Sequence, residues 1–247
     1  MAVESERMTP FTIIWDFDGT LLPSDPYDSE HTLLLYNINA SDERLSPAKR
    51  IVGRTIIFLD RKKWMGPAFK RYYAWVLSGT RMNRLDGVSE MLAHKISGSD
   101  RASLRYLDHH GHTQMIISCG TLDLIERILE HAGIRSCFKC IEGNRFLSAN
   151  DRIIGIQNRI IHPTDKLKPI KGQDINADRV IAVGDGYTDL PLLDWARFPV
   201  LMDRSQTKSR LPADRLYSKI ASISDLPGWI ERLSCENGPA ICRQKRK

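Results

Sequence analysis

The chain has 247 residues, of which 42% are hydrophobic, and its formal net charge is +6. This length and apolar content allow one well-buried core with a smaller insertion. The five cysteines are odd in number, and no apolar run reaches the ~18 residues of a membrane helix, so we expect neither a disulfide framework nor a membrane partner. The amino terminus does not resemble a signal peptide, which predicts a cytoplasmic protein.

The positive charge is spread over residues 61–63, 204–210 and 243–247, and none of these segments carries a nucleic-acid-binding motif. We therefore expect no nucleic-acid partner. A positive field also attracts anions to a site, which suits a small phosphorylated metabolite as substrate. The sequence leaves the oligomeric state and the role of the basic tail open.

The first predicted element is a buried strand over residues 11–15, an apolar run that stops at Asp16 and Asp18. Gly19 allows the backbone to turn out of the sheet directly afterwards. The two carboxylates are thus expected at the carboxyl end of a strand. In an open α/β sheet that edge is where ligands bind.

Two prolines in residues 23–26 then lead the chain away from the sheet, and helical periodicity follows to about residue 98. Four successive helical segments without a strand between them predict an all-α insertion. We expect an α/β core made of residues 1–22 and 99–237, a helical cap over residues 23–98, and a basic flexible tail over residues 238–247.

Two further short strands end in polar residues, as the first one does. The strand at 115–117 runs into Ser118, Cys119 and Gly120, and the strand at 180–183 runs into the segment 184–189. The other predicted elements are helices at 99–110, 122–131, 188–196 and 226–233, a hairpin around Asn150-Asp151 within 144–161, short strands at 138–141 and 198–202, and a short helix after residue 164.

If the three polar-ended strands are neighbours in one parallel sheet, their polar groups lie at one edge. Several carboxylates that converge there without a cation would repel one another and raise each other's pKa. A hard divalent cation resolves this repulsion. Mg²⁺ prefers one or two carboxylates together with water and phosphate oxygens, which matches the predicted groups.

These segments resemble the four motifs of the haloacid dehalogenase-like hydrolases, in the same order. The matching residues are Asp16-Phe17-Asp18-Gly19-Thr20, then Ser118, then a lysine within 166–171, and finally Gly184-Asp185-Gly186-Tyr187-Thr188-Asp189. The resemblance implies a Rossmann-like parallel sheet with helices on both faces, and the helical insertion takes the place of that family's cap.

The resemblance also implies roles for the motif residues. Asp16 would be the nucleophile that forms an aspartyl-phosphate, and Asp18 the acid and base that exchanges protons with the leaving group and with water. Ser118 and a lysine would bind phosphoryl oxygens. Lys166 is favoured, Lys168 comes second, and Lys171 is also eligible. The implied Mg²⁺ ligands are Asp16, the backbone carbonyl of Asp18, Asp185 and Asp189, and the implied phosphate-binding residues also include Gly19, Thr20, Cys119 and Gly120.

Because Asp18 is present and the last motif reads Gly-Asp-Gly, the chain is most similar to the phosphoserine phosphatase branch of the family. We therefore expect a Mg²⁺-dependent phosphomonoesterase, with a phosphotransferase or phosphomutase using the same intermediate as the alternative. A non-catalytic scaffold or nucleic-acid-binding protein is the alternative from another class. The cap residues that would recognise the leaving group are left open, with Asp25, Asp28, Glu30, Arg54, Arg61 and Lys62 as candidates.

Overall fold

The computed structural model describes residues 10–41, 45–171, 173, 175–204 and 217–237, without the side chains of 235–237. The predicted tail at 238–247 and most of the basic segment 204–210 lie outside the described residues. Within them the chain forms a seven-stranded sheet in the order β4-β3-β2-β1-β5-β6-β7. The strands are β1 (Thr12–Trp15), β2 (Thr113–Thr121), β3 (Cys140–Ala149), β4 (Arg152–Gln157), β5 (Val180–Gly184), β6 (Phe198–Met202) and β7 (Ser218–Ile220).

The strand β1 lies between β2 and β5 and is parallel to both, with Trp15 opposite Ile116 on one side and Val183 on the other. The other strand pairs are also parallel, except that β4 runs antiparallel to β3. The carboxyl ends of β1, β2 and β5 therefore lie at one edge of the sheet, as the sequence predicts.

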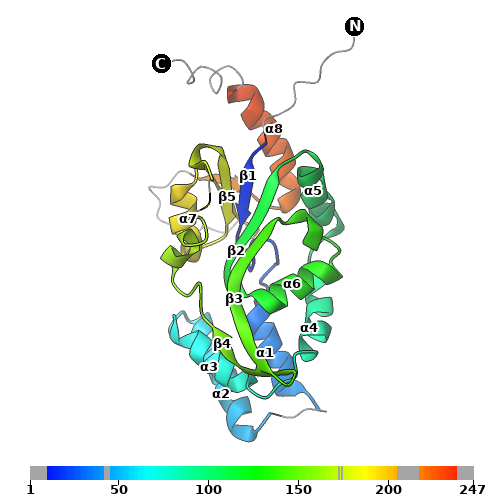
Figure 1. Cartoon of the computed structure of the whole chain (residues 1–247), viewed down its shortest axis with the longest axis vertical. Helices are drawn as coiled ribbons and strands as arrows, with labels where there is room; N and C mark the ends of the chain where they lie inside the picture. Colours follow the sequence, from blue (N-terminus) through cyan, green and yellow to red (C-terminus); the bar gives the residue numbers. More distant parts are fainter. Residues whose placement is uncertain (1–9, 42–44, 172, 174, 205–216, 238–247) are drawn as a thin grey trace.

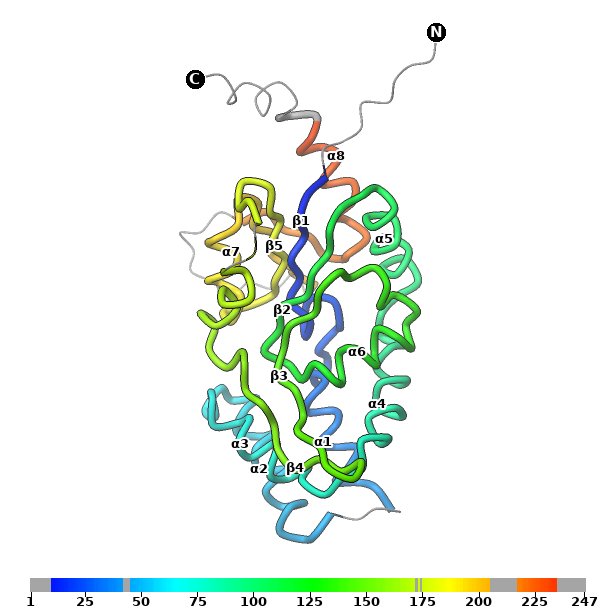
Figure 2. The backbone as a smooth tube through the Cα atoms, viewed as in Figure 1, coloured from blue at the N-terminus to red at the C-terminus, as the bar shows by residue number. Residues whose placement is uncertain are grey.

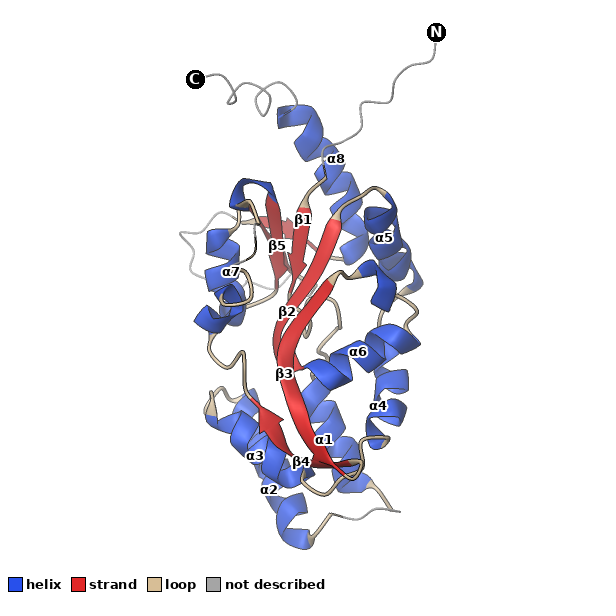
Figure 3. Ribbon diagram, viewed as in Figure 1, coloured by secondary structure: helices blue, strands red, loops and turns tan. Residues whose placement is uncertain are grey.

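Helices cover both faces of the sheet (Figure 3). They are α1 (Ser29–Asn39), α2 (Pro47–Arg61), α3 (Ala68–Leu77), α4 (Arg84–Ala93), α5 (Gly98–His109), α6 (Leu122–His131), α7 (Leu190–Trp195) and α8 (Leu226–Asn237). Along β1, Ile13 and Trp15 pack in the cluster that includes α5, α6 and α8, whereas Ile14 packs on the opposite side with α7. This alternation is typical of a strand buried on both faces. The predicted α/β fold class is confirmed.

The helices α1 to α4 lie beyond the carboxyl ends of β1 and β5 (Figure 1). They are the four helices predicted for residues 23–98. Their apolar side chains, such as Leu33 and Leu92, share one hydrophobic cluster with Trp15 of the sheet. We propose that the chain divides into an α/β core and a helical cap, and that the two share this hydrophobic cluster.

The hairpin of β3 and β4 reaches these helices (Figure 2). The Gly79 N–H, just after α3, donates to the Ile153 carbonyl at 2.7 Å. The predicted turn at Asn150-Asp151 is confirmed, since both residues have positive φ, 49° and 59°. A type I′ turn, which is common in two-residue hairpin loops, requires positive φ at both positions. The short strand predicted at 138–141 is confirmed only for its second half, because β3 begins at Cys140 and continues into the hairpin.

Two other elements differ from the sequence prediction. The helix expected after residue 164 is a short 3₁₀ helix, η2 (Pro163–Leu167), and a second 3₁₀ turn, η4 (Tyr187–Asp189), precedes α7. The edge strand β7 was not predicted. It has three residues and an exposed polar start, so its sequence carries no apolar pattern.

Candidate active site

Asp16 follows β1 directly, and its backbone N–H donates to the Val183 carbonyl of β5 at 2.9 Å. The residue is only 5% exposed, and its Oδ1 accepts a hydrogen bond from Lys166 Nζ at 2.5 Å. Burial and the nearby charge of Asp189 raise the pKa of Asp16 to about 7, and Lys166 opposes that rise. Among the described residues, no donor bonds Oδ2, so this oxygen is available to a ligand.

Asp18 points away from Asp16 toward the first turn of α1. Its Oδ1 accepts from the Ser29 N–H and its Oδ2 from the Ser29 hydroxyl, both at 2.8 Å. Burial, followed by the charge of Asp28, raises the pKa of Asp18 to about 7. A carboxyl group with such a pKa can both give and take a proton near neutral pH, which acid–base catalysis requires.

The end of β2 brings Ser118 beside Asp18. Ser118 Oγ accepts a hydrogen bond from the Gly120 N–H at 3.0 Å. A Cβ atom on Gly120 would lie 3.1 Å from Ser118 Oγ and 3.3 Å from Asp18 Oδ2, so both oxygens face this glycine. Burial raises the pKa of the Cys119 thiol to about 11, which excludes Cys119 as a thiolate nucleophile at neutral pH.

Asp189 organises the last predicted motif. Its Oδ2 accepts from the backbone N–H groups of Asp185 and Gly186, each at 3.0 Å, and its Oδ1 accepts from Lys166 Nζ. The residue is fully buried, and a Cβ atom on Gly184 would lie 2.4 Å from the Asp189 Cβ. With both oxygens bonded, Asp189 holds the Asp185 loop and Lys166 in position.

The acids form a group that fits a divalent cation. Carboxylate oxygens of Asp16, Asp185 and Asp189 lie within 4.8 Å of one another. Loss of water around Asp185, then the charges of Asp189 and Asp16, raise the pKa of Asp185 to about 8, although the residue keeps an exposed side. Asp16 and Asp185 therefore repel each other when charged, and a hard cation between them would remove this cost. The side chain of Asp18 lies outside this group. Asp18 could therefore bind such a cation through its backbone carbonyl.

The structure distinguishes the candidate lysines. Lys166 in η2 is fully buried and bonds Asp16 and Asp189, whereas Lys168 is 68% exposed in its side chain and pairs with Asp165 Oδ1 at 2.8 Å. Burial opposes the charge of Lys166, but Asp16 and Asp189 outweigh it and raise the pKa of Lys166. The expectation that Lys168 joins the site is thus wrong, and Lys171 is also exposed.

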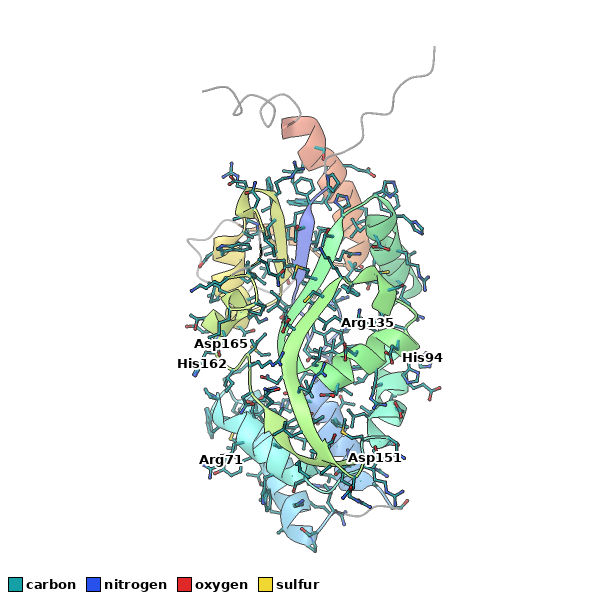
Figure 4. All side chains as sticks on the ribbon, in the orientation of Figure 1. Arg71, His94, Arg135, Asp151, His162 and Asp165 are labelled. Atoms are coloured by element: carbon teal, nitrogen blue, oxygen red, sulfur yellow. The ribbon has the colours of Figure 1, made fainter. Side chains whose placement is uncertain are left out.

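The short helix η2 is oriented by Asp165, which lies near His162 at the left of the sheet in Figure 4. Asp165 Oδ2 accepts from the N–H groups of Ile161 and His162, at 3.0 and 2.9 Å. Lys168 and these two N–H groups lower the pKa of Asp165. The turn is therefore fixed before Lys166, whose side chain extends inward.

Thr20, the last residue of the first motif, is also buried. Its carbonyl accepts from Arg204 Nη2 at 2.7 Å, and its hydroxyl has no hydrogen-bond partner among the described residues. A buried hydroxyl without a partner costs free energy unless a ligand satisfies it. Thr20 is therefore compatible with its predicted contact to a phosphate.

A buried polar cluster between the cap helices and β2 has no signal in the sequence. Lys70 of α3 forms an ion pair with Glu30 of α1, and the Thr121 hydroxyl donates to the other oxygen of Glu30. Glu30 and Lys70 are both buried, and the Tyr73 side chain is fully buried beside them. Glu30, a candidate for binding the leaving group, is thus already bonded.

Asn144 also supports the site, and no sequence pattern predicts this role. Its Oδ1 accepts from the N–H groups of Arg159 and Ile160, and its Nδ2 donates to the Cys119 carbonyl at 2.7 Å. It fixes the segment after Ser118 against the loop that leads to η2.

A mostly parallel sheet with helices on both faces and an acid cluster at its carboxyl edge defines an α/β protein of the Rossmann-like type. The haloacid dehalogenase-like hydrolase family matches residues 13–194, more than half of the chain, and the protein belongs to this family. The predicted resemblance is confirmed. Comparison with curated proteins gives no match. In the part of the chain that the structure describes, no helix combines the length and apolarity needed to cross a membrane.

Solved structures with the same fold include a HAD family hydrolase from Salmonella enterica serovar Typhi, with 18% identity, a TM-score of 0.68, and coverage of 90% of this chain and 72% of that chain. A substrate-bound phosphoserine phosphatase has 15% identity and a TM-score of 0.64, with 91% and 98% covered. A phosphoserine phosphohydrolase-like protein from Francisella tularensis has 19% identity and a TM-score of 0.63, with 89% and 99% covered. At these identities the similarity shows the fold.

Proposed function

We propose that the protein is a Mg²⁺-dependent phosphomonoesterase that hydrolyses a small phosphorylated metabolite through an aspartyl-phosphate. The observation that carries this proposal is the arrangement around Asp16: one oxygen is bonded to the buried Lys166, and the other is available at the carboxyl edge of the sheet. Asp18 follows two residues later on the other side, with a pKa of about 7. Membership of a hydrolase family supports the same reaction class.

In the first half-reaction, Asp16 Oδ2 attacks phosphorus in line, and the bond between phosphorus and the leaving-group oxygen breaks. Protonated Asp18 gives its proton to the departing alkoxide. In the second half-reaction, Asp18 takes a proton from water as that water attacks phosphorus. The bond to Asp16 breaks, and phosphate leaves with Asp16 restored.

The site stabilises the anionic phosphoryl group through groups already in place. Lys166 and the Ser118 hydroxyl would contact its equatorial oxygens, and preorganised donors of this kind lower the barrier because they need no rearrangement. Asp16, Asp185 and the Asp18 carbonyl would hold Mg²⁺, which neutralises charge on the phosphate when bound. Asp189 positions Lys166 and the Asp185 loop.

The alternatives predict other outcomes. A phosphotransferase or phosphomutase would use the same intermediate but would need a second hydroxyl as acceptor. A scaffold or nucleic-acid-binding protein would not need Asp16, Ser118, Lys166 and Asp185 gathered at one edge of the sheet. The cytoplasmic location remains a prediction.

The deciding experiment is a screen of phosphorylated metabolites, O-phosphoserine included, for release of free phosphate without any added acceptor. Asp16→Asn should reduce the release by several orders of magnitude, because a covalent nucleophile is lost. Asp178→Asn is the matched control, since Asp178 is exposed and outside the acid cluster. Release that requires a sugar acceptor would favour the phosphotransferase, and full activity of Asp16→Asn would contradict the proposed nucleophile.

A further inference from the structure

A pocket of about 480 Å³ lies between α1 and the carboxyl-terminal half of α2. Its lining includes three cations and two aromatic rings, and no acid lines it: Arg54, Arg61, Lys62, Tyr27 and Phe58. The aromatic rings and the adjoining aliphatic side chains give the pocket an apolar floor. Pockets that combine such a floor with a few charged groups are typical of small-molecule sites.

In the part of the chain that the structure describes, the three cations of this pocket have no acidic partner. Arg54 donates to the Asn39 amide oxygen at 3.2 Å, and the Arg61 guanidinium lies 4.9 Å from the centre of the Tyr27 ring. Lys62 lies 6.0 Å from the centre of the Phe58 ring. Among the residues that the structure describes, none of the three cations forms an ion pair, so the pocket carries uncompensated positive charge.

The nearby acids are bonded elsewhere, which explains this lack of partners. His31 lies between Asp28 and Asp60, with Nδ1 3.0 Å from Asp28 Oδ2 and Nε2 3.2 Å from Asp60 Oδ2. Burial opposes the charge of His31, but the two carboxylates outweigh it and raise the pKa of His31 to about 9. Charged His31 therefore lies within ion-pair distance of both acids and offsets one of their two negative charges.

Both walls of the pocket continue along the chain to residues near the candidate active site. Tyr27 is two residues before Ser29, which bonds the Asp18 carboxylate. Lys95 Nζ fixes this segment by donating to the carbonyls of Asp25 and Tyr27, at 3.0 and 3.3 Å. On the other wall, α2 lies beyond the carboxyl ends of β1 and β5 (Figure 1), and Lys63, just after α2, lies close enough to Asp185 to counter the rise in its pKa.

We propose that this pocket binds a second anionic group, a phosphate or a carboxylate, carried on the leaving group of the substrate. The inference rests on the proposed phosphomonoesterase function and names its substrate class: an ester with two separated anionic ends. The phosphoryl group to be transferred would lie at Asp16, and the second anion at Arg54, Arg61 and Lys62. The apolar floor would contact the body of the molecule between them.

The same arrangement disfavours a leaving group that carries an ammonium group. Such a cation would meet the three positive side chains of the pocket. Of the nearby acids, Glu30 is paired with Lys70, and Asp28 and Asp60 share the charge of His31. O-Phosphoserine should therefore be a poorer substrate than 3-phosphoglycerate, which has the same skeleton with a hydroxyl group in place of the ammonium.

The test compares kcat/KM for matched esters: fructose 6-phosphate against fructose 1,6-bisphosphate, and glycerol 3-phosphate against 3-phosphoglycerate. The first pair tests a phosphate and the second a carboxylate as the second anion. Arg61→Met should lower kcat/KM for the preferred dianionic ester roughly tenfold to a hundredfold, the value of one charge-assisted hydrogen bond. Its effect on p-nitrophenyl phosphate should stay within about twofold, since that ester has no second anion. The matched control is Arg71→Met, which removes the same charge from the exposed outer side of α3 (Figure 4).

The wild-type protein should prefer at least one dianionic ester over its partner, and Arg61→Met alone should abolish that preference. Equal kcat/KM within both pairs, or an equal effect of Arg61→Met and Arg71→Met, would overturn the inference while leaving phosphatase activity intact. If no ester is hydrolysed, the proposed function fails, and calorimetric binding of the same esters still decides on the pocket. Binding of fructose 1,6-bisphosphate or 3-phosphoglycerate that Arg61→Met weakens would support it, and no binding would overturn it.

Discussion

Replacing Lys166 by methionine should destabilise the protein far more than the same change at Lys168. Methionine keeps the length of the side chain and removes the ammonium, so Asp16 and Asp189 lose the cation between them. Removing one partner of a buried ion pair costs about 3–5 kcal/mol, because the remaining charge stays buried. Lys168 pairs with Asp165 at the surface, and Lys168→Met should cost about 0–1 kcal/mol.

The destabilisation by Lys166→Met should also depend on pH. Burial and Asp189 already raise the folded-state pKa of Asp16 to about 7, above the ordinary value of 3.8, and loss of Lys166 should raise it further. A carboxyl group with a raised pKa lowers stability as pH increases from its unfolded-state value through its folded-state value. Near pH 6 the variant can protonate Asp16, whereas near pH 8 it loses this relief, so the cost should be about 1 kcal/mol larger near pH 8.

Urea unfolding in the presence of a chelator measures both effects without a metal that could replace the lost cation. Initial rates of phosphate release give a second readout, because Lys166→Met should lower turnover by a factor on the order of 10²–10³, whereas Lys168→Met should leave it near that of the wild type. A loss of stability that is equal for the two variants would refute the placement of Lys166. The placement would also be refuted if Lys166→Met lost the same unfolding free energy, relative to wild type, near pH 6 and near pH 8.

Three other predictions follow from the site and its surroundings. A chelator should abolish phosphate release, and added Mg²⁺ should restore it and raise the urea midpoint. Ca²⁺ should inhibit, because its larger coordination shell invites extra carboxylate ligation. Full activity in the chelator would exclude a metal requirement. Gly19→Ala should abolish activity, since Gly19 has a φ of 88° and an added Cβ atom would lie 2.3 Å from Asp185 Oδ2. By contrast, a Cβ atom added at Gly186 meets no atom within 4 Å, so Gly186→Ala should fold with a normal urea midpoint. The stabilisation by the charged His31 should be complete below pH 6.5 and lost as pH rises through about 9. The difference in unfolding free energy between wild type and His31→Gln should therefore shrink as pH rises. A difference that stays constant with pH would contradict the ion pairs.

The sequence predicted the centre of the fold because buried parallel strands are continuous apolar runs. The strands β1, β2 and β5 each stop at a polar motif, and their shared direction brings those motifs to one edge. The strands at the margin of the sheet were harder to predict. β3 is half exposed along its length and β7 is three residues long, so neither produces a clear apolar pattern. Their positions are set by pairing with their neighbours.

The choice between Lys166 and Lys168 shows where sequence patterns stop being sufficient. Both lysines precede the third motif strand at similar distances, and both are compatible with a short helix. The structure decides between them through Asp165, whose carboxylate bonds the N–H groups at the start of η2 and pairs with Lys168. That contact holds Lys168 at the surface and leaves Lys166 on the inner side of the turn. Such a preference depends on three-dimensional contacts that spacing along the chain does not encode.

The same limit applies to the cap, where all six candidate residues for binding the leaving group are charged. All of them except Asp25 have described side-chain contacts near α1 and α2. The sequence gives each of them equal weight. In the structure, Asp28 is bonded by His31 of the same helix, whereas Glu30 is paired with Lys70, forty residues further along the chain. Among the described residues, Arg54 and Arg61 pair with no acid and contact the uncharged Asn39 and Tyr27 instead. The positive charge that we propose the cap offers to a substrate is therefore a property of the folded cap, because the sequence places acids and bases side by side.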